Sequence, residues 1–222
     1  MGLSVFLELS KVKITFAVAL TTITGYLLAK GQFDTGIILP TLGIFLLACG
    51  SSAINHYQER DRDAIMERTR LRPIPSGRIS ANGALIFAVL ISTAGSLLLY
   101  FSSGMLAMEL GLIALLWYNA IYTPLKKRTA FAVVPGAVIG AIPPLVGWVA
   151  AGAMITDPRA IIMAFFFFIW QVPHFWLLLF AFGNDYEEAG LPSLTRLFTK
   201  AQLARLTFLW TLVTVGTSLL LR

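Results

Sequence analysis

The stretch "GIILPTLGIFLLACGSSAINHYQERDRD", residues 36–63, passes from a long apolar run directly into a cluster of charges. The 19 residues from 36 to 54 carry no charge, whereas five of the next nine are charged. An apolar run of this length predicts a transmembrane helix, which needs about 20 mostly apolar residues. We therefore expect a membrane helix that ends in a polar site.

The whole chain has the composition of a membrane protein. Of its 222 residues, 57% are hydrophobic and 13% are charged, against about 25% charged in soluble domains. Because lipid offers no partner to unpaired backbone groups, the apolar segments should be helices. We predict an all-α, polytopic transmembrane bundle, a single domain over residues 1–222, with seven spans at 14–29, 36–54, 83–102, 105–123, 130–151, 160–182 and 206–221.

The basic residues predict how the bundle is oriented. If the N-terminus is cytoplasmic and the spans alternate, only Lys30, Arg159 and Arg222 of the 17 lysines and arginines lie outside, and fourteen lie inside. Basic residues favour the cytoplasmic side. The same alternation places the polar segments 55–80, 119–129 and 183–205 at one face, where we expect the chemistry.

Three oxygen-bearing side chains follow one another at helical spacing in the first of these segments. Asn55, Glu59 and Asp63 are spaced i, i+4 and i+8, so they stack on one face if the second span continues past its apolar part. Hard oxygen ligands of this kind suit Mg²⁺, which commonly bridges one or two carboxylates and the phosphates of a substrate. The row predicts a magnesium site.

Arginines are interleaved with these acids. Arg62 borders the acidic face, and guanidinium groups are permanently charged, bidentate partners for phosphate. Acids for a metal together with arginines for an anion indicate a metal–diphosphate site. The alternative is a solvated loop whose arginines only set topology, but topology has no use for Asn55, Glu59 and Asp63 in register.

The other two segments of this face carry matching groups. "NAIYTPLKKRT" (119–129) supplies Lys126 and Lys127, which could equally serve membrane topology. "GNDYEEAGLPSL" (183–194) supplies a second acidic cluster, for which a solvated turn is the alternative. Its members are Asn184, Asp185, Glu187 and Glu188.

Polar and helix-breaking residues also occur inside the spans. "WQVPHFW" (170–176) places Gln171 and His174 in the sixth span, with His174 about 15 Å from the polar end by helical rise. An ionisable residue at that depth is a candidate for function, although a histidine packed between helices fits the same position. Gly136 and Gly140 have the spacing that favours close helix packing.

Taken together, these segments resemble the UbiA-type intramembrane prenyltransferases, and among them the branch that farnesylates heme. The row is similar to the family's Asn-x-x-x-Asp-x-x-x-Asp motif, with Glu59 as its middle acid. The segments "DRDAIMERTRLRPIPSGRI", "YTPLKKRT", "GAIPPLVGW", "QVPHFW" and "DYEEAGLPSL" match that branch in order and spacing. Ala189 departs from the second acidic motif. The family fold has nine helices, so the resemblance also implies that the last two are absent here or that this is a short member.

The resemblance implies an enzyme with a defined set of site residues. It implies catalysis through Mg²⁺ bound by Asn55, Glu59, Asp63 and Asp185. The resemblance also implies that farnesyl diphosphate would be bound through Arg62, Arg68, Lys126 and Lys127. The farnesyl group would then be transferred to a vinyl group of heme b, and water addition would complete a hydroxyethylfarnesyl substituent. His174 is assigned to the acceptor, heme b.

Two other functions stay open at this point. A related prenyltransferase could use an aromatic acid or a chlorophyll-type ring as acceptor, and a transporter or channel could carry charged gates. A transporter predicts charges along a membrane path, whereas these spans are nearly free of charge apart from Glu109. The expected setting is the lipid bilayer of a bacterial inner membrane, with the active site on the cytoplasmic side. Heme A synthase or oxidase assembly factors are candidate partners, and no nucleic acid is expected.

Overall fold

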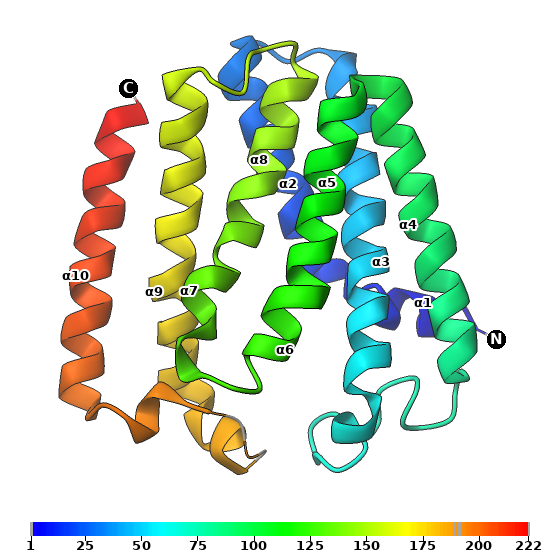
Figure 1. The fold of residues 1–222 in the computed structure, drawn as a ribbon, viewed down its shortest axis with the longest axis vertical. Helices are drawn as coiled ribbons and strands as arrows, with labels where there is room; N and C mark the ends of the chain where they lie inside the picture. Colours follow the sequence, from blue (N-terminus) through cyan, green and yellow to red (C-terminus); the bar gives the residue numbers. More distant parts are fainter. Residues whose placement is uncertain (1, 189, 191, 222) are drawn as a thin grey trace.

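The computed structural model describes residues 2–188, 190 and 192–221, and for Leu179, residues 181–188 and Leu221 it describes the backbone alone. Within these residues every regular element is helical (Figure 1). The α-helices are α1 Leu3–Leu9, α2 Val12–Lys30, α3 Ile38–Asp63, α4 Ala81–Ser103, α5 Met105–Leu116, α6 Thr123–Leu125, α7 Val133–Gly136, α8 Val138–Ala150, α9 Pro158–Glu188 and α10 Lys200–Ser218. The shorter turns are η1 Thr35–Ile37, η2 Trp117–Tyr122, η3 Ala130–Ala132, η4 Leu194–Arg196 and η5 Leu219–Leu221.

The predicted all-α bundle is confirmed, and each predicted span coincides with a helix or a run of helices. Six segments of the described chain are long and apolar enough to cross a membrane: Val12–Lys30, Thr35–Asp63, Ala81–Ser103, Met105–Leu125, Ala130–Ala150 and Pro158–Leu178. The seventh predicted span forms α10, which lies beside α9 (Figure 1). It is 19 residues long but is not apolar enough to be counted with the six.

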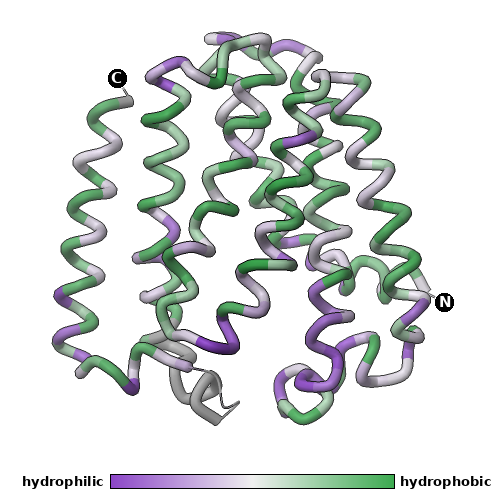
Figure 2. The backbone as a smooth tube through the Cα atoms, in the orientation of Figure 1, coloured by the Kyte–Doolittle hydropathy of each residue, from purple (hydrophilic) through white to green (hydrophobic). Residues whose placement is uncertain are grey.

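The helices alternate in direction, so the connections after α3, α6 and α9 lie at the same end of the bundle (Figure 1). Hydrophilic residues gather at this end, most densely over the last turns of α3 and the loop that follows it (Figure 2). The prediction that three polar segments share one face is therefore met by the backbone. We call this end the polar end.

Small residues allow close helix crossings around the core. A Cβ at Gly25 of α2 would overlap the backbone carbonyl of Pro144 in α8, and a Cβ at Gly147 would overlap that of Thr22. Such small residues let backbones approach where the bilayer gives no hydrophobic driving force between helices. The α2–α8 crossing forms one wall of the bundle interior.

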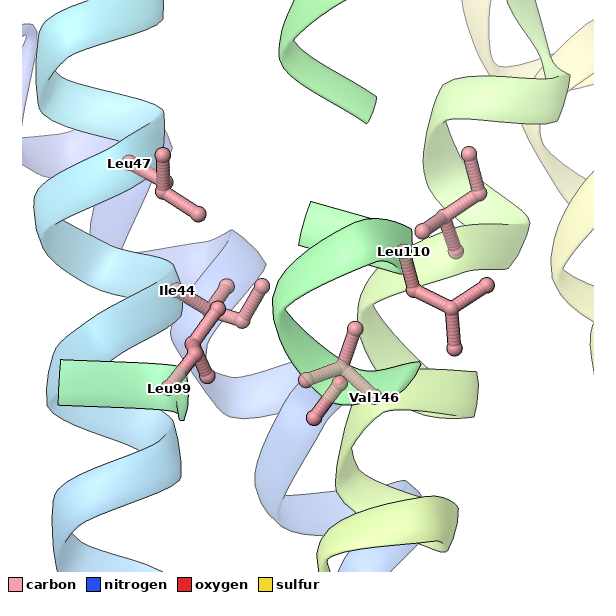
Figure 3. Close-up of a cluster of buried hydrophobic side chains, with 7 residues drawn as sticks. Ile44, Leu47, Leu99, Leu110 and Val146 are labelled. Atoms are coloured by element: carbon pink, nitrogen blue, oxygen red, sulfur yellow. The ribbon is translucent and has the colours of Figure 1, made fainter. Parts of the chain in front are cut away.

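An apolar cluster closes the interior away from the polar end. Ile44, Leu47 and Leu99 point toward Leu110 and Val146 across the gap between α3 and α5 (Figure 3). All five side chains are buried. Because α3, α4, α5 and α8 all contribute, this cluster holds the four helices in fixed positions beneath the polar end.

Candidate active site

The last turns of α3 present the predicted oxygen row. Helix α3 continues past its apolar part to Asp63, so Asn55, Glu59 and Asp63 stand on one helical face as expected. Their exposed fractions are only 1%, 9% and 4%. Buried carboxylates are costly unless they are paired, so their partners determine what this site can bind.

Glu59 is paired with Lys126, which lies just after α6. The lysine Nζ is 2.9 Å from one carboxylate oxygen and 3.0 Å from the other. The ammonium group also lies 5.7 Å from the ring centre of Tyr122. The structure thus places a predicted diphosphate-binding lysine directly against a predicted metal ligand.

Asp63 is paired with Arg72, which the sequence did not single out. Arg72 Nη1 donates to both carboxylate oxygens, at 2.7 and 2.8 Å. The Thr69 hydroxyl donates to the backbone carbonyl of Asp63 and so ties the loop back to α3. The loop after α3 therefore folds back and returns its own arginine to the acidic face.

Asn55 is held by Lys11, a second residue that the sequence analysis did not assign to the site. Lys11 Nζ donates to Asn55 Oδ1 at 3.1 Å, and Asn55 Nδ2 donates to the Thr123 hydroxyl at 3.3 Å. Lys11 joins α1 to α2 in the left-handed conformation, with φ 45° and ψ 51°. No other non-glycine residue of the described chain has positive φ, and strain of this kind clusters at functional sites.

The surroundings of Lys11 also affect its charge. Burial, followed by the nearby cations Arg72 and Lys126, lowers the pKa of Lys11 to about 8. Two carboxylates and three cations thus form the centre of the site, an excess of one positive charge while Lys11 is protonated. An anion is the ligand that such an excess favours.

The other predicted basic residues take part in no ion pair of the described side chains. Arg62 Nη1 is buried and has no hydrogen-bond partner there, so it is a donor without an acceptor. Arg68 is exposed and Lys127 is half-buried. Their assignment to a diphosphate stays a prediction.

The predicted second acidic cluster falls on the last turns of α9. Asp185 and its neighbours Asn184, Glu187 and Glu188 belong to this helix, but their side chains lie outside the described residues. Among the side chains that are described, no three His, Cys, Asp or Glu residues group as a metal site. The contribution of Asp185 to a metal site stays a prediction.

His56 is a further residue that sequence reasoning overlooked. It is 2% exposed, and neither ring nitrogen has a hydrogen-bond partner within the described part of the chain. It follows Asn55 directly and lies one helical turn before Glu59. An ionisable residue near the end of a membrane helix is the signal that could have revealed it.

A π-helical turn, η2, supports the site from α5. Asn119 in this turn donates to the Ser51 hydroxyl at 2.7 Å, and its backbone carbonyl accepts from Gln58 Nε2 at 3.1 Å. Single π turns inside helices are frequent at functional sites. Through these two hydrogen bonds, η2 is attached to α3 just before α6, the helix that begins at Thr123.

An apolar cavity of about 220 Å³ opens beneath the charged groups. Lys11, Ser51 and Ser52 line it near the polar end, and Ile44, Leu47 and Gly111 line it near the buried apolar cluster. The distance from Ser52 to Ile44 is about 12 Å along α3 by helical rise. A long apolar chain with a charged head matches this arrangement of a charged mouth and a deep apolar interior.

The predicted acceptor residue lies elsewhere. His174 is exposed on α9 and stacks on Trp170, with ring centres 5.0 Å apart. It is not part of the cavity wall, whereas its neighbours Gln171 and Phe175 are. The role assigned to His174 stays a prediction.

Comparison with known proteins agrees with this geometry. Residues 18–222 match the profile of the UbiA prenyltransferase family. The chain belongs to the UbiA prenyltransferase family. The backbone resembles the solved structure of a UbiA homologue from Archaeoglobus fulgidus bound to GPP and Mg²⁺, with a TM-score of 0.75, 16% identity and coverage of 96% of this chain and 76% of that one. It also resembles a digeranylgeranylglyceryl phosphate synthase, with a TM-score of 0.76, 23% identity and coverage of 98% and 76%.

Within the UbiA family, similar sequences are named protoheme IX farnesyltransferase. One from Geobacter sulfurreducens is 42% identical over 79% of this chain and 65% of its own length. One from Nitratidesulfovibrio vulgaris is 37% identical over 89% and 69%. A mitochondrial relative from Arabidopsis thaliana is 39% identical over 85% and 44%. The chain therefore spans about two thirds of the length of the bacterial relatives it matches.

Proposed function

We propose that this chain is a magnesium-dependent prenyltransferase that transfers the farnesyl group of farnesyl diphosphate to a vinyl group of heme b, giving heme O. The observation that carries the proposal is the charge-paired row at the mouth of an apolar cavity. The names of the relatives from Geobacter sulfurreducens and Nitratidesulfovibrio vulgaris support the choice of donor and acceptor.

Binding of the diphosphate is inferred from the three cations that contact Asn55, Glu59 and Asp63. Lys11, Lys126 and Arg72 are held by oxygen acceptors of α3, and each can turn from its acceptor to a phosphate oxygen. Arg62, Arg68 and Lys127 add further positive charge at this end. Electrostatic stabilisation of the departing diphosphate is the catalytic contribution of these residues.

The donor set of the row fits Mg²⁺. Asn55, Glu59 and Asp63 offer only oxygen atoms on one buried face, and each is held by a cation. These three residues, with Asp185, would hold the metal. When bound, it supplies positive charge that neutralises the leaving group.

The cavity holds the hydrocarbon chain and keeps bulk water from C1 of the farnesyl group. The bond between farnesyl C1 and the diphosphate oxygen breaks, and its electron pair leaves with the diphosphate. The vinyl group of heme supplies the electrons of the new carbon–carbon bond. Water then adds to the resulting cation on the carbon next to the macrocycle. On the acceptor side we assign His174, on the outward face of α9, to heme.

Each of the two alternative functions, a prenyltransferase with another acceptor and a transporter, is distinguished from the proposed one by a single feature. A different acceptor would keep the row and the cavity but would not account for relatives named after protoheme IX. A transporter needs charged groups along a membrane path, whereas the buried ion pairs of the described chain, Asp63–Arg72 and Glu59–Lys126, lie at one end.

The mass of the heme provides the direct test. The chain should be expressed in cells that lack heme O, and the extracted heme should gain the mass of one farnesyl group and one hydroxyl group. A matched culture expressing Asp63→Asn serves as the control. Heme b alone in both cultures, with the protein folded and inserted, would contradict the proposal.

We further propose that the polar end faces the cytoplasm of a bacterial inner membrane. The fourteen basic residues of this end support that orientation. Single cysteines in the loops after α3, α6 and α9, in a Cys49→Ala background, should resist impermeant thiol reagents in intact cells. Labelling of any one of these loops from outside the cell would contradict the proposed orientation.

A further inference from the structure

The apolar cavity contains one amide side chain whose role is unassigned. Gln171 of α9 lines the cavity and is half-buried. It makes no hydrogen bond with any residue that the structure describes. An amide in an apolar setting costs free energy unless it is hydrogen-bonded, so its presence calls for a polar ligand inside the cavity.

The neighbouring helix makes room for this amide. A Cβ at Gly140 of α8 would overlap the amide group of Gln171. Gly140 therefore lets the side chain lie directly against the α8 backbone. The Gly136–Gly140 spacing predicts a close contact between helices, and at Gly140 the group in close contact is the Gln171 side chain.

The α8 backbone at this point carries carbonyl groups without α-helical partners. Pro143 and Pro144 lie inside α8 and have no N–H. The carbonyls four residues earlier, at Ile139 and Gly140, therefore lack the donors that an α-helix normally supplies. The Gln171 amide lies against Gly140, whose carbonyl is one of these two, and a buried water typically makes about three hydrogen bonds.

The level of this niche suits the reacting carbon. The ring of Tyr122 lies against Gly136 and next to Lys126 of the charged row. Gly140 is four residues further along, about 6 Å deeper by helical rise. The niche thus lies about one helical turn below the charged mouth.

We propose that Gln171 is the positioning residue for the water that completes the reaction, held between its amide and the α8 carbonyls of Ile139 and Gly140. This inference rests on the proposed function. The water oxygen gives an electron pair to the cation on the carbon beside the macrocycle and forms the carbon–oxygen bond. The water then loses one proton to the released diphosphate. Without a positioned water, the cation loses a proton from the adjacent carbon instead, and the product is an alkene that is lighter by one water.

Other polar side chains of the wall are less suited to this role. The Thr15 hydroxyl donates to the carbonyl of Val12, and the Ser51 hydroxyl accepts from Asn119. The Ser52 hydroxyl has no partner but is fully buried, so it is not open to the cavity. His174 lies on α9 but outside the cavity wall.

The test is the ratio of hydrated to dehydrated farnesylated heme, measured by mass spectrometry in H₂¹⁸O with the complete chain in membranes. Gln171→Leu should shift this ratio toward the alkene by about tenfold or more, the scale of one lost hydrogen bond to a reacting group. Gln171→Glu, which keeps oxygen acceptors, should restore much of the hydrated product. Ser52→Ala and His174→Leu should keep the wild-type ratio at whatever turnover they show.

Gly140→Ala provides an independent variant, because its methyl group displaces the Gln171 amide and should raise the alkene fraction. An unchanged ratio in Gln171→Leu would overturn the inference. So would absence of product in Gln171→Leu together with a wild-type ratio in Gly140→Ala. A wild-type chain that makes no farnesylated heme would instead refute the proposed function, so the two failures are distinguishable.

Discussion

The two ends of the bundle use ion pairs in different ways. At the polar end, Asp63 and Arg72 form a pair whose side chains are 5% and 22% exposed. At the opposite end, Asp157 and Arg159 pair at a similar distance, 2.9 Å, but the arginine side chain is 70% exposed. The shortest nitrogen–oxygen distances of the two pairs are similar, whereas the exposure of their side chains differs.

The difference indicates which charged residues should be tested for a role in ligand binding. An exposed pair contributes little free energy because water screens it. A buried pair is retained at a desolvation cost that a hydrophobic pair would avoid. The buried pairs Asp63–Arg72 and Glu59–Lys126 are therefore the ones we expect to serve a ligand. Four predictions test this contrast. They are ordered from the largest expected effect to an expected absence of effect.

The largest effect is expected from the carboxylates of the row. Asp63→Asn and Glu59→Gln should each lower turnover by at least roughly 100-fold, the scale of losing a preorganised charge-stabilising group. The protein should still insert and fold, because the side-chain shape is kept. Turnover of purified protein at saturating Mg²⁺ and diphosphate measures the loss. Glu67→Gln, an exposed acid in the loop after α3, is the matched control, and near-normal turnover in both row variants would exclude the site.

The second effect separates stability from catalysis. Lys126→Met leaves Glu59 without its partner and should lower the free energy of unfolding by about 2 kcal/mol, less than for a fully buried pair. The double variant Glu59→Gln, Lys126→Met should recover most of that stability but none of the activity. Thermal unfolding in detergent and turnover are the two measurements. Recovery of activity in the double variant would show that the pair is only structural.

The third effect concerns the deep end of the cavity. A Cβ at Gly111 would lie 2.7 Å from Leu47 Cδ1 and 2.8 Å from Leu99 Cδ1, so Gly111→Ala shortens the space for the prenyl chain. The preference for geranyl over farnesyl diphosphate, measured as a ratio of kcat/KM, should rise about tenfold. Gly216→Ala, where nothing lies within 4 Å of the new methyl, controls for helix propensity. An unchanged ratio would place the end of the prenyl chain elsewhere.

The smallest effect is expected at the opposite end. Asp157→Asn removes the exposed pair with Arg159 and should change neither thermal unfolding nor turnover measurably. Both should be compared with wild type in the same detergent. A loss of activity comparable to that of Asp63→Asn would abolish the contrast between the two ends.

Sequence patterns predicted most of the fold because the bilayer imposes length and apolarity on every span. The short helix α1 was not predicted, since seven residues are too few to give a membrane signal. Helix α10 begins at Lys200, six residues before the predicted span at 206. The capping box of Thr199 and Gln202 marks that start, and such a box is readable in a sequence.

The site was only half predictable. Helical spacing gave the register of Asn55, Glu59 and Asp63, because one helix carries all three. Sequence spacing could not assign Lys11 and Arg72 to the site. Lys11 lies between α1 and α2 and Arg72 lies in the loop after α3, and packing determines how these two segments fold toward Asn55 and Asp63. Gln171 appeared in a notable motif, but only the position of Gly140 shows that its amide turns inward.

The π-helical turn η2 has a consequence for insertions and deletions. A π turn holds one residue more than an α turn, so Trp117–Tyr122 amounts to a one-residue insertion absorbed inside a membrane helix. Removing one residue there would restore an α-helical repeat and rotate Thr123 and Lys126 by about 100° relative to α3. Sequence alignments of this family should therefore place a gap within that turn, and lineages that lost the extra residue should have lost the lysine contact to Glu59 with it.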